Sequence, residues 1–182
     1  RDHPNPEFIN KKLSDSQKEA VQHAISAEDL AIIHGPPGTG KTTAVIELIL
    51  QLVKQEKKVL ACAPSHVAVD NMLERLLKAK SKPETVRIGH PAKTHEALRS
   101  RCLDVLAKSH ENAKLIAQLY KDSRQMFRQA SKWTRARRSG GEKKEQRELA
   151  KMYRKEARRL ERNVLSHIMD RSSVICSTLT GL

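Results

Sequence analysis

The stretch Gly35-Pro36-Pro37-Gly38-Thr39-Gly40-Lys41-Thr42 decides the fold, because it matches the phosphate-binding loop pattern G-x-x-x-x-G-K-[ST] at every required position. The apolar residues 30–33 precede it and predict a buried strand. Residues 43–55 follow it with apolar side chains at helical spacing. The competing interpretation is a glycine-rich turn that matches by chance. Strand, loop and helix in this order favour a nucleotide site.

The residue types in this loop suit phosphate and a metal ion. Its glycines let the backbone turn with N–H groups facing inward, which forms a cradle for an anion at a helix N-terminus. Lys41 is expected to reach the β- and γ-phosphates of a nucleotide, and the Thr42 hydroxyl to bind Mg²⁺. Lys41 and Thr42 are therefore the catalytic candidates, and Thr42 is the candidate metal ligand.

Alternating strands and helices predict an α/β fold with a parallel sheet. Three more strands are expected, at residues 58–63, 84–88 and 173–176, with a helix at 67–80 after the first of them. From Thr94 to His167 the sequence has no strand signal and no proline. This segment predicts an inserted helical hairpin with its tip near Gly140.

Positive charge is concentrated in that insertion. The chain of 182 residues has 35 Lys and Arg against 21 Asp and Glu, a net charge of +14, and residues 121–162 supply 16 of the bases and 6 of the acids. The segment is either a phosphate-binding surface, with Arg135, Arg137 and Arg138 as candidates, or a solvated helical face with ion pairs such as Glu148–Lys151. Six acids are too few for sixteen bases, which favours a nucleic-acid partner.

Several classes of protein are disfavoured by composition. Cys62, Cys102 and Cys176 are far apart and form no C-x-x-C pair, so neither a disulfide framework nor a zinc site is indicated. No apolar run approaches the ~18–20 residues that span a bilayer, and residues 1–6 lack the apolar core of a signal peptide. We expect no membrane partner and a cytoplasmic or nuclear location. Because the sequence does not begin with Met, we also expect a piece of a longer protein.

Other polar positions have two interpretations each. The Gln17 amide matches the donor–acceptor edge of adenine, or it completes a capping box with Ser14. Residues 63–70, at the carboxyl end of the second expected strand, suit contacts to a nucleic-acid strand. Spacing alone favours an ordinary turn there, with Ser65 as the helix cap. The hydroxyls after the last strand, from residues 177–180, have the same two interpretations.

These segments, taken in order, resemble a known family. Residues 13–17, 35–42 and 63–71 resemble the front half of the first motor domain of superfamily 1 RNA/DNA helicases of the up-frameshift-like branch. His34–Thr43 and Val86–Ala92 are most similar to the immunoglobulin mu-binding-protein type. The resemblance is strong over residues 13–93, fair over 172–181, and only architectural over the insertion.

The resemblance implies an α/β phosphate-loop NTPase domain of the RecA-like type, a parallel sheet with an inserted helical hairpin subdomain. It divides the chain into a connector (1–12), the first part of motor domain 1A (13–93), a basic helical insertion (94–167) and a return strand that stops before the Asp-Glu motif (168–182). The Asp-Glu pair, the second motor domain with its arginine finger and the accessory β-barrel are not in this sequence. We therefore expect the isolated chain to bind nucleotide weakly without turning over ATP or unwinding a duplex.

For the intact protein the resemblance implies an ATP-dependent 5′-to-3′ RNA/DNA helicase with ATP and Mg²⁺ as cofactors. The expected partners are ATP and single-stranded RNA or DNA, with a ribosome or ribonucleoprotein as a further candidate. The cofactor contacts implied by position are Gln17, Gly35, Pro36, Pro37, Gly38, Thr39, Gly40, Lys41, Thr42 and Thr43. The implied nucleic-acid contacts are Pro64, Ser65, His66, Val67, Thr178 and Thr180.

One residue departs from the family pattern, and two other functions compete. His66 stands where this branch usually has Asn, although an imidazole can still donate to a phosphate. The first competing function is a nucleic-acid-binding module whose affinity is switched by nucleotide, without translocation. The second is another phosphate-loop ATPase, such as a AAA-type remodeller.

Overall fold

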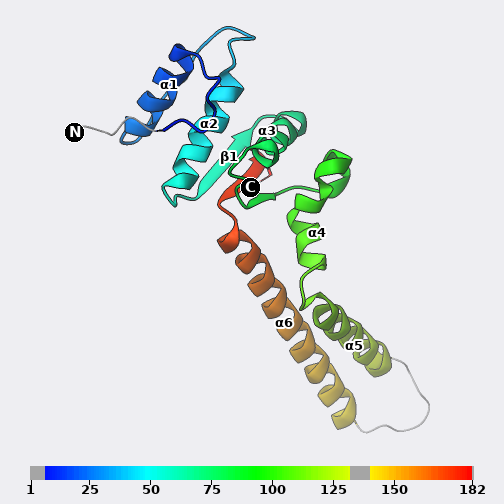
Figure 1. Cartoon of the computed structure of the whole chain (residues 1–182). Helices are drawn as coiled ribbons and strands as arrows, with labels where there is room; N and C mark the ends of the chain where they lie inside the picture. Colours follow the sequence, from blue (N-terminus) through cyan, green and yellow to red (C-terminus); the bar gives the residue numbers. More distant parts are fainter. Residues whose placement is uncertain (1–6, 132–139, 182) are drawn as a thin grey trace. The chain divides into compact units, whose positions relative to one another are not determined.

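The computed structural model describes residues 7–131 and 140–181, which form two units. The first unit comprises the described residues of Arg1–Leu103 and Met169–Leu182, and the second is Asp104–Ile168. Figure 1 shows their helices and strands. No described helix is both long and apolar enough to cross a membrane.

The first unit is an α/β layer built on a parallel sheet, as the sequence predicts. Its strands are β1 (Val59–Ala63), β2 (Thr85–Arg87) and β3 (Val174–Thr178), in the spatial order β1-β3-β2. Val174 of β3 is in register with both Val59 and Thr85. The helices of this unit are α1 (Asp15–Ser26), α2 (Lys41–Lys54) and α3 (His66–Lys78), with short 3₁₀ turns η1 (Pro91–Lys93) and η2 (Glu96–Arg101).

The core of this unit lies where α2 and α3 meet the sheet. Both helices present apolar stripes, because their aliphatic residues recur at three- and four-residue spacing. β1 and β3 contribute alternate residues from the sheet face. The buried members are Ile46, Ile49, Leu50, Ala61, Ala63, Val69, Leu73, Leu76, Leu98, Val174 and Cys176.

One predicted strand is wrong. Residues 30–33 have no strand pairing in the structure, and the side chains of Leu30 and Ile32 are 79% and 76% exposed. A strand forms only where a neighbouring backbone completes its hydrogen bonds. Both β1 and β2 pair with β3, and no described segment pairs with the other edge of β1. Residues 30–33 therefore stay unpaired despite their apolar composition.

The second unit is helical, and it begins later than the sequence predicts. The expected insertion starts at Thr94, but the structure keeps residues 94–103 with the sheet unit. The reason is burial: Thr94, Leu98 and Cys102 are at most 6% exposed, and Leu98 belongs to the core described above. The helices beyond are α4 (Leu103–Lys108), α5 (Ala113–Ser131) and α6 (Gly140–Arg171).

Helices α5 and α6 pack along each other in the second unit (Figure 1). Ala150, Ala157 and Val164 of α6 are buried at seven-residue spacing, which is the period of a helix–helix seam. Ser123 of α5 donates to the Ala150 carbonyl at 2.8 Å. Because two of these three seam residues are alanines, the two backbones can come close enough for this side-chain-to-backbone contact. The predicted helical hairpin therefore has its two long arms in α5 and α6.

Candidate nucleotide site and nucleic-acid surfaces

The phosphate loop, Gly35–Thr42, connects the unpaired residues 30–33 to α2. Gly38 and Gly40 have φ angles of +84° and +81°, a left-handed conformation that glycine adopts without strain. Among the described residues, no acceptor receives the backbone N–H groups of Gly38 to Thr42. Five successive free amides at a helix N-terminus form an anion-binding concavity. The geometry is that of a phosphate cradle.

Lys41 lies across this cradle. Its ammonium group donates to the carbonyls of Gly35 and, at 2.7 Å, of Pro36. Thr39 Oγ1 also donates to the Pro36 carbonyl, at 2.9 Å. Backbone carbonyls of the loop thus bind the Lys41 ammonium group, while the backbone amides of the loop remain available for an anion.

Gln17 forms the capping box that the sequence offers as one of its two roles, and its side-chain amide also contacts the phosphate loop. Its Oε1 accepts from the Ser14 N–H at 3.1 Å while Ser14 Oγ accepts from the Gln17 N–H, which completes the capping box of α1. Its Nε2 also donates to the Thr39 carbonyl of the phosphate loop at 3.1 Å. The capping box is therefore confirmed, and the same amide lies against the loop where a nucleotide would bind.

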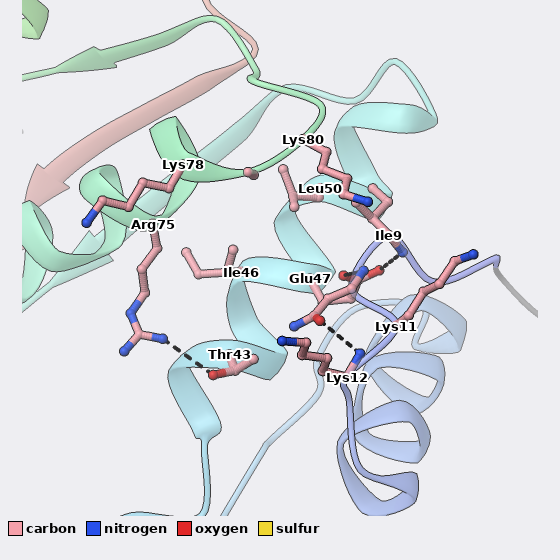
Figure 2. A pocket seen from close by; sticks show the side chains of 12 residues that line it. Ile9, Lys11, Lys12, Thr43, Ile46, Glu47, Leu50, Arg75, Lys78 and Lys80 are labelled. Atoms are coloured by element: carbon pink, nitrogen blue, oxygen red, sulfur yellow. Dashed lines mark hydrogen bonds between the residues drawn. The ribbon is translucent and has the colours of Figure 1, made fainter.

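A cavity of about 400 Å³ opens beside the first turns of α2, between the segment around residues 9–12 and the end of α3. Figure 2 shows Arg75 reaching Thr43 Oγ1 at 3.4 Å and Glu47 facing the backbone of Ile9. Glu47 is buried, and its carboxylate accepts from the N–H groups of Ile9 and Asn10 at 2.8 and 3.0 Å. The remaining lining is an apolar floor of Ile46, Leu50 and Ala79 and a cationic rim of Lys11, Lys12, Lys78 and Lys80.

The strand-end loop, Pro64–Val67, begins α3 at the carboxyl end of β1. Ser65 caps the helix, because its Oγ accepts from the Ala68 N–H at 3.2 Å. The ordinary-turn interpretation is thus correct for the Ser65 side chain in this structure. Pro64, Ser65 and Val67 are exposed and His66 is half-buried, so the loop also presents a surface to a ligand.

The two threonines of the last strand differ in accessibility. Thr178 is 8% exposed at the end of β3, whereas Thr180 is exposed in the turn that follows. The Gly181 N–H donates to the Thr178 carbonyl at 3.0 Å and closes that turn. Because β1 and β3 are parallel neighbours and Ala63 is in register with Thr178, this turn lies at the same sheet edge as the strand-end loop.

In the second unit, basic side chains of α6 form a surface that we call the cationic face: Lys151, Arg154, Lys155, Arg158 and Arg162. With Phe127 of α5 and Glu161, they line a cavity of about 650 Å³. Lys151 is paired with Glu148 at 2.8 Å, as predicted. Within the described part of the chain, the other four cations have no ion pair.

The acid in this cavity is already engaged. Glu161 Oε2 accepts from the Tyr120 hydroxyl at 2.8 Å, which joins α5 to α6. Burial, together with this hydrogen bond and the nearby negative charge, raises the pKa of the Tyr120 phenol above its usual value. The sequence-predicted candidates Arg135, Arg137 and Arg138 lie outside the described residues.

Sequence reasoning missed one buried charged pair. Arg87 of β2 is fully buried, and its Nε donates to Asp70 Oδ1 of α3 at 2.6 Å. A signal was present: a lone arginine between Val86 and Ile88 in an apolar strand requires a buried acidic partner. Among the described residues no cluster of three His, Cys, Asp or Glu side chains could hold a metal ion.

The fold and the loop together define a phosphate-loop nucleotide-binding domain on a parallel sheet. Residues 12–182 match the family model of the AAA domain (AAA_11), and the chain belongs to that family. It is 43% identical to the rat DNA-binding protein SMUBP-2 over 96% of its length, and 37% identical to the DNA polymerase alpha-associated DNA helicase A of Schizosaccharomyces pombe over 96%. An ATP-dependent helicase of Methanocaldococcus jannaschii is 43% identical over 70% of the chain.

The chain spans only part of each relative. It covers 17% of the rat protein, 26% of the fission-yeast protein and 19% of the archaeal protein. The similarity to superfamily 1 helicases that the motifs indicate is confirmed by these relatives.

Proposed function

We propose that this chain is the ATP-binding part of an ATP-dependent RNA/DNA helicase that moves 5′ to 3′ along a single strand. The observation that carries the proposal is the phosphate loop, in which the five free amides of Gly38 to Thr42 lie beside the Lys41 ammonium group. Partial positive charges at a helix N-terminus and one full charge together favour a polyphosphate. Relatives that are named as helicases support the same activity.

The residues of the loop would divide the nucleotide between them. The amides and Lys41 would bind the β- and γ-phosphates, and Thr43 would lie beside them on the first turn of α2. The Thr42 hydroxyl is exposed, which fits a ligand of Mg²⁺, the ion that neutralises charge on the phosphates when bound. Gln17 would contact adenine, since its amide already lies against the loop.

The nucleic-acid strand would bind two separate surfaces. The first surface, in the sheet unit, comprises the strand-end loop and the turn with Thr178 and Thr180, which both lie at the carboxyl ends of paired strands. In the helical unit it is the cationic face, whose unpaired cations suit backbone phosphates. The protein would encounter an RNA substrate in the cytoplasm or the nucleus, and a ribosome or ribonucleoprotein would be the larger partner there.

The test is ATP hydrolysis by the full-length protein with and without single-stranded oligouridylate. Lys41→Ala is expected to abolish hydrolysis, whereas Lys54→Ala, at the other end of α2, removes an exposed lysine as a matched control. Duplexes with a 5′ or a 3′ single-stranded tail then report direction. Hydrolysis that RNA does not stimulate would favour another phosphate-loop ATPase. RNA-stimulated hydrolysis without strand separation would favour the nucleotide-switched binding module.

A further inference from the structure

A buried charged network lies directly behind the strand-end loop. Arg87 is 0% exposed, and its guanidinium contacts both Asp70 and His66. Nε donates to Asp70 Oδ1 at 2.6 Å, while Nη2 lies 3.3 Å from Nδ1 of His66. The other Asp70 oxygen accepts from the His95 N–H at 2.8 Å. His66, the residue that departs from the family pattern, is thus joined to an ion pair in the interior.

The contact between Arg87 and His66 determines which ring nitrogen carries the proton. A guanidinium has donors and no acceptor, and it stays protonated in proteins. Nδ1 of His66 must therefore accept, which places the proton of the neutral imidazole on Nε2. A proton on Nδ1 would set two N–H groups against each other. The hydrogen bond consequently selects one tautomer and fixes the plane of the ring.

The surroundings hold Arg87 in place for this contact. The Asp70 carboxylate is itself oriented by the His95 backbone, and Arg87 Nη1 also lies 3.4 Å from the Ile88 carbonyl. Gly89 has a φ of +141°, and a Cβ added there would lie 2.5 Å from Arg87 Nη1. A side chain at position 89 would displace the guanidinium, so the glycine is required by the network.

We infer that Arg87 is a positioning residue that holds His66 as the Nε2–H tautomer, so that the imidazole donates a hydrogen bond to a phosphodiester oxygen of the bound strand. The last step rests on the proposed function. His66 lines a cavity of about 450 Å³ together with the donors Asn71, Lys93 and His95 and with the acid Glu74, which is itself paired with Lys78. Asn71, Lys93 and His95 offer further donors around the site where a phosphate would lie.

The first experiment observes the tautomer and does not depend on nucleic acid. Long-range ¹H–¹⁵N spectra of histidine-labelled protein should show Nδ1 of His66 unprotonated and Nε2 protonated, with His66→Asn used to assign the signals. Arg87→Lys keeps a buried positive charge but cannot contact Asp70 and His66 together, so it should give mixed tautomers. Lys57→Met removes an exposed charge at the opposite edge of the sheet and should change nothing. A protonated Nδ1 in the unsubstituted protein would overturn the inference.

The second experiment measures affinity for a fluorescent fifteen-nucleotide oligouridylate. His66→Ala should weaken binding about two- to tenfold, the effect of one hydrogen bond. Arg87→Lys should weaken it similarly, but should add nothing in the His66→Ala background, because its effect passes through His66. An equal loss in both backgrounds would make Arg87 a structural residue only. If the tautomer is as inferred and neither substitution changes affinity, the strand contact in the proposed function is wrong while the tautomer assignment stands.

Discussion

The cationic face makes a quantitative prediction about salt. Replacing its four unpaired cations with glutamine removes the charges and keeps good helix formers, so α6 should remain folded. Each contact to a phosphate of a single strand contributes about 0.7 to the slope of log affinity against log salt. Four contacts correspond to a slope smaller by about 2.8. When salt rises fourfold, from about 50 to 200 mM, both proteins should lose affinity for RNA. The fold-loss of the original protein should exceed that of the substituted protein by a factor of about 50. The four residues are Arg154, Lys155, Arg158 and Arg162.

Fluorescence anisotropy with single-stranded RNA at several salt concentrations measures both slopes in the full-length protein. The charge-matched control removes four exposed lysines of the sheet unit: Lys54, Lys57, Lys58 and Lys82. If the slope of the first variant equals that of the original, the cationic face is a solvated helix surface. If the control changes the slope as much as the first variant, total charge rather than this face determines binding.

Three further predictions concern the sheet unit. Arg87→Met should lower the free energy of unfolding by about 3–5 kcal/mol, because it leaves the Asp70 carboxylate buried without its partner. Denaturant titrations measure this loss, and adding Asp70→Leu should restore part of it. If the effects of the two substitutions simply add, the pairing is refuted. Gly40→Ala should destabilise the chain by about 1–2 kcal/mol in thermal unfolding, because alanine is strained at the φ of +81°; the new Cβ would also displace the side-chain amide of Gln17. Burial raises the pKa of the Cys176 thiol to about 12 from an ordinary 9.0, so the free energy of unfolding should fall as pH rises from about 9 toward 12. Iodoacetamide at pH 8 should modify Cys62 first, because Cys62 is half-buried whereas Cys102 and Cys176 are buried.

Local features of this chain could be predicted from sequence because local chemistry determines them. The capping box of Ser14 and Gln17 depends on residues three apart, and the structure forms both of its hydrogen bonds. The helix after the phosphate loop follows from the spacing of aliphatic residues, and α2 ends one residue before the expected position. Three of the four expected strands also form, because each has a neighbouring strand to pair with.

Features that depend on distant partners could not be predicted in the same way. Residues 30–33 have the composition of a buried strand, but pairing needs a neighbour that the described chain does not place beside them. Likewise, the sequence places Thr94 in the insertion because no strand signal follows residues 84–88 until residue 173, whereas burial keeps Thr94 with the sheet unit. The link from Arg87 to His66 spans 21 positions and becomes visible only when β2 and α3 are packed together.

The contacts inside the phosphate loop explain how a nucleotide could enter without large rearrangement. In this structure the Lys41 ammonium group donates to two neutral carbonyls, of Gly35 and Pro36. A phosphate oxygen carries negative charge, so its Coulomb attraction to the ammonium group is stronger than that of a neutral carbonyl. Exchanging these carbonyls for phosphate oxygens is therefore favourable and requires only rotation of one flexible side chain. The amides of Gly38 to Thr42 make no competing bond with described residues, so the cradle is already formed when the anion arrives.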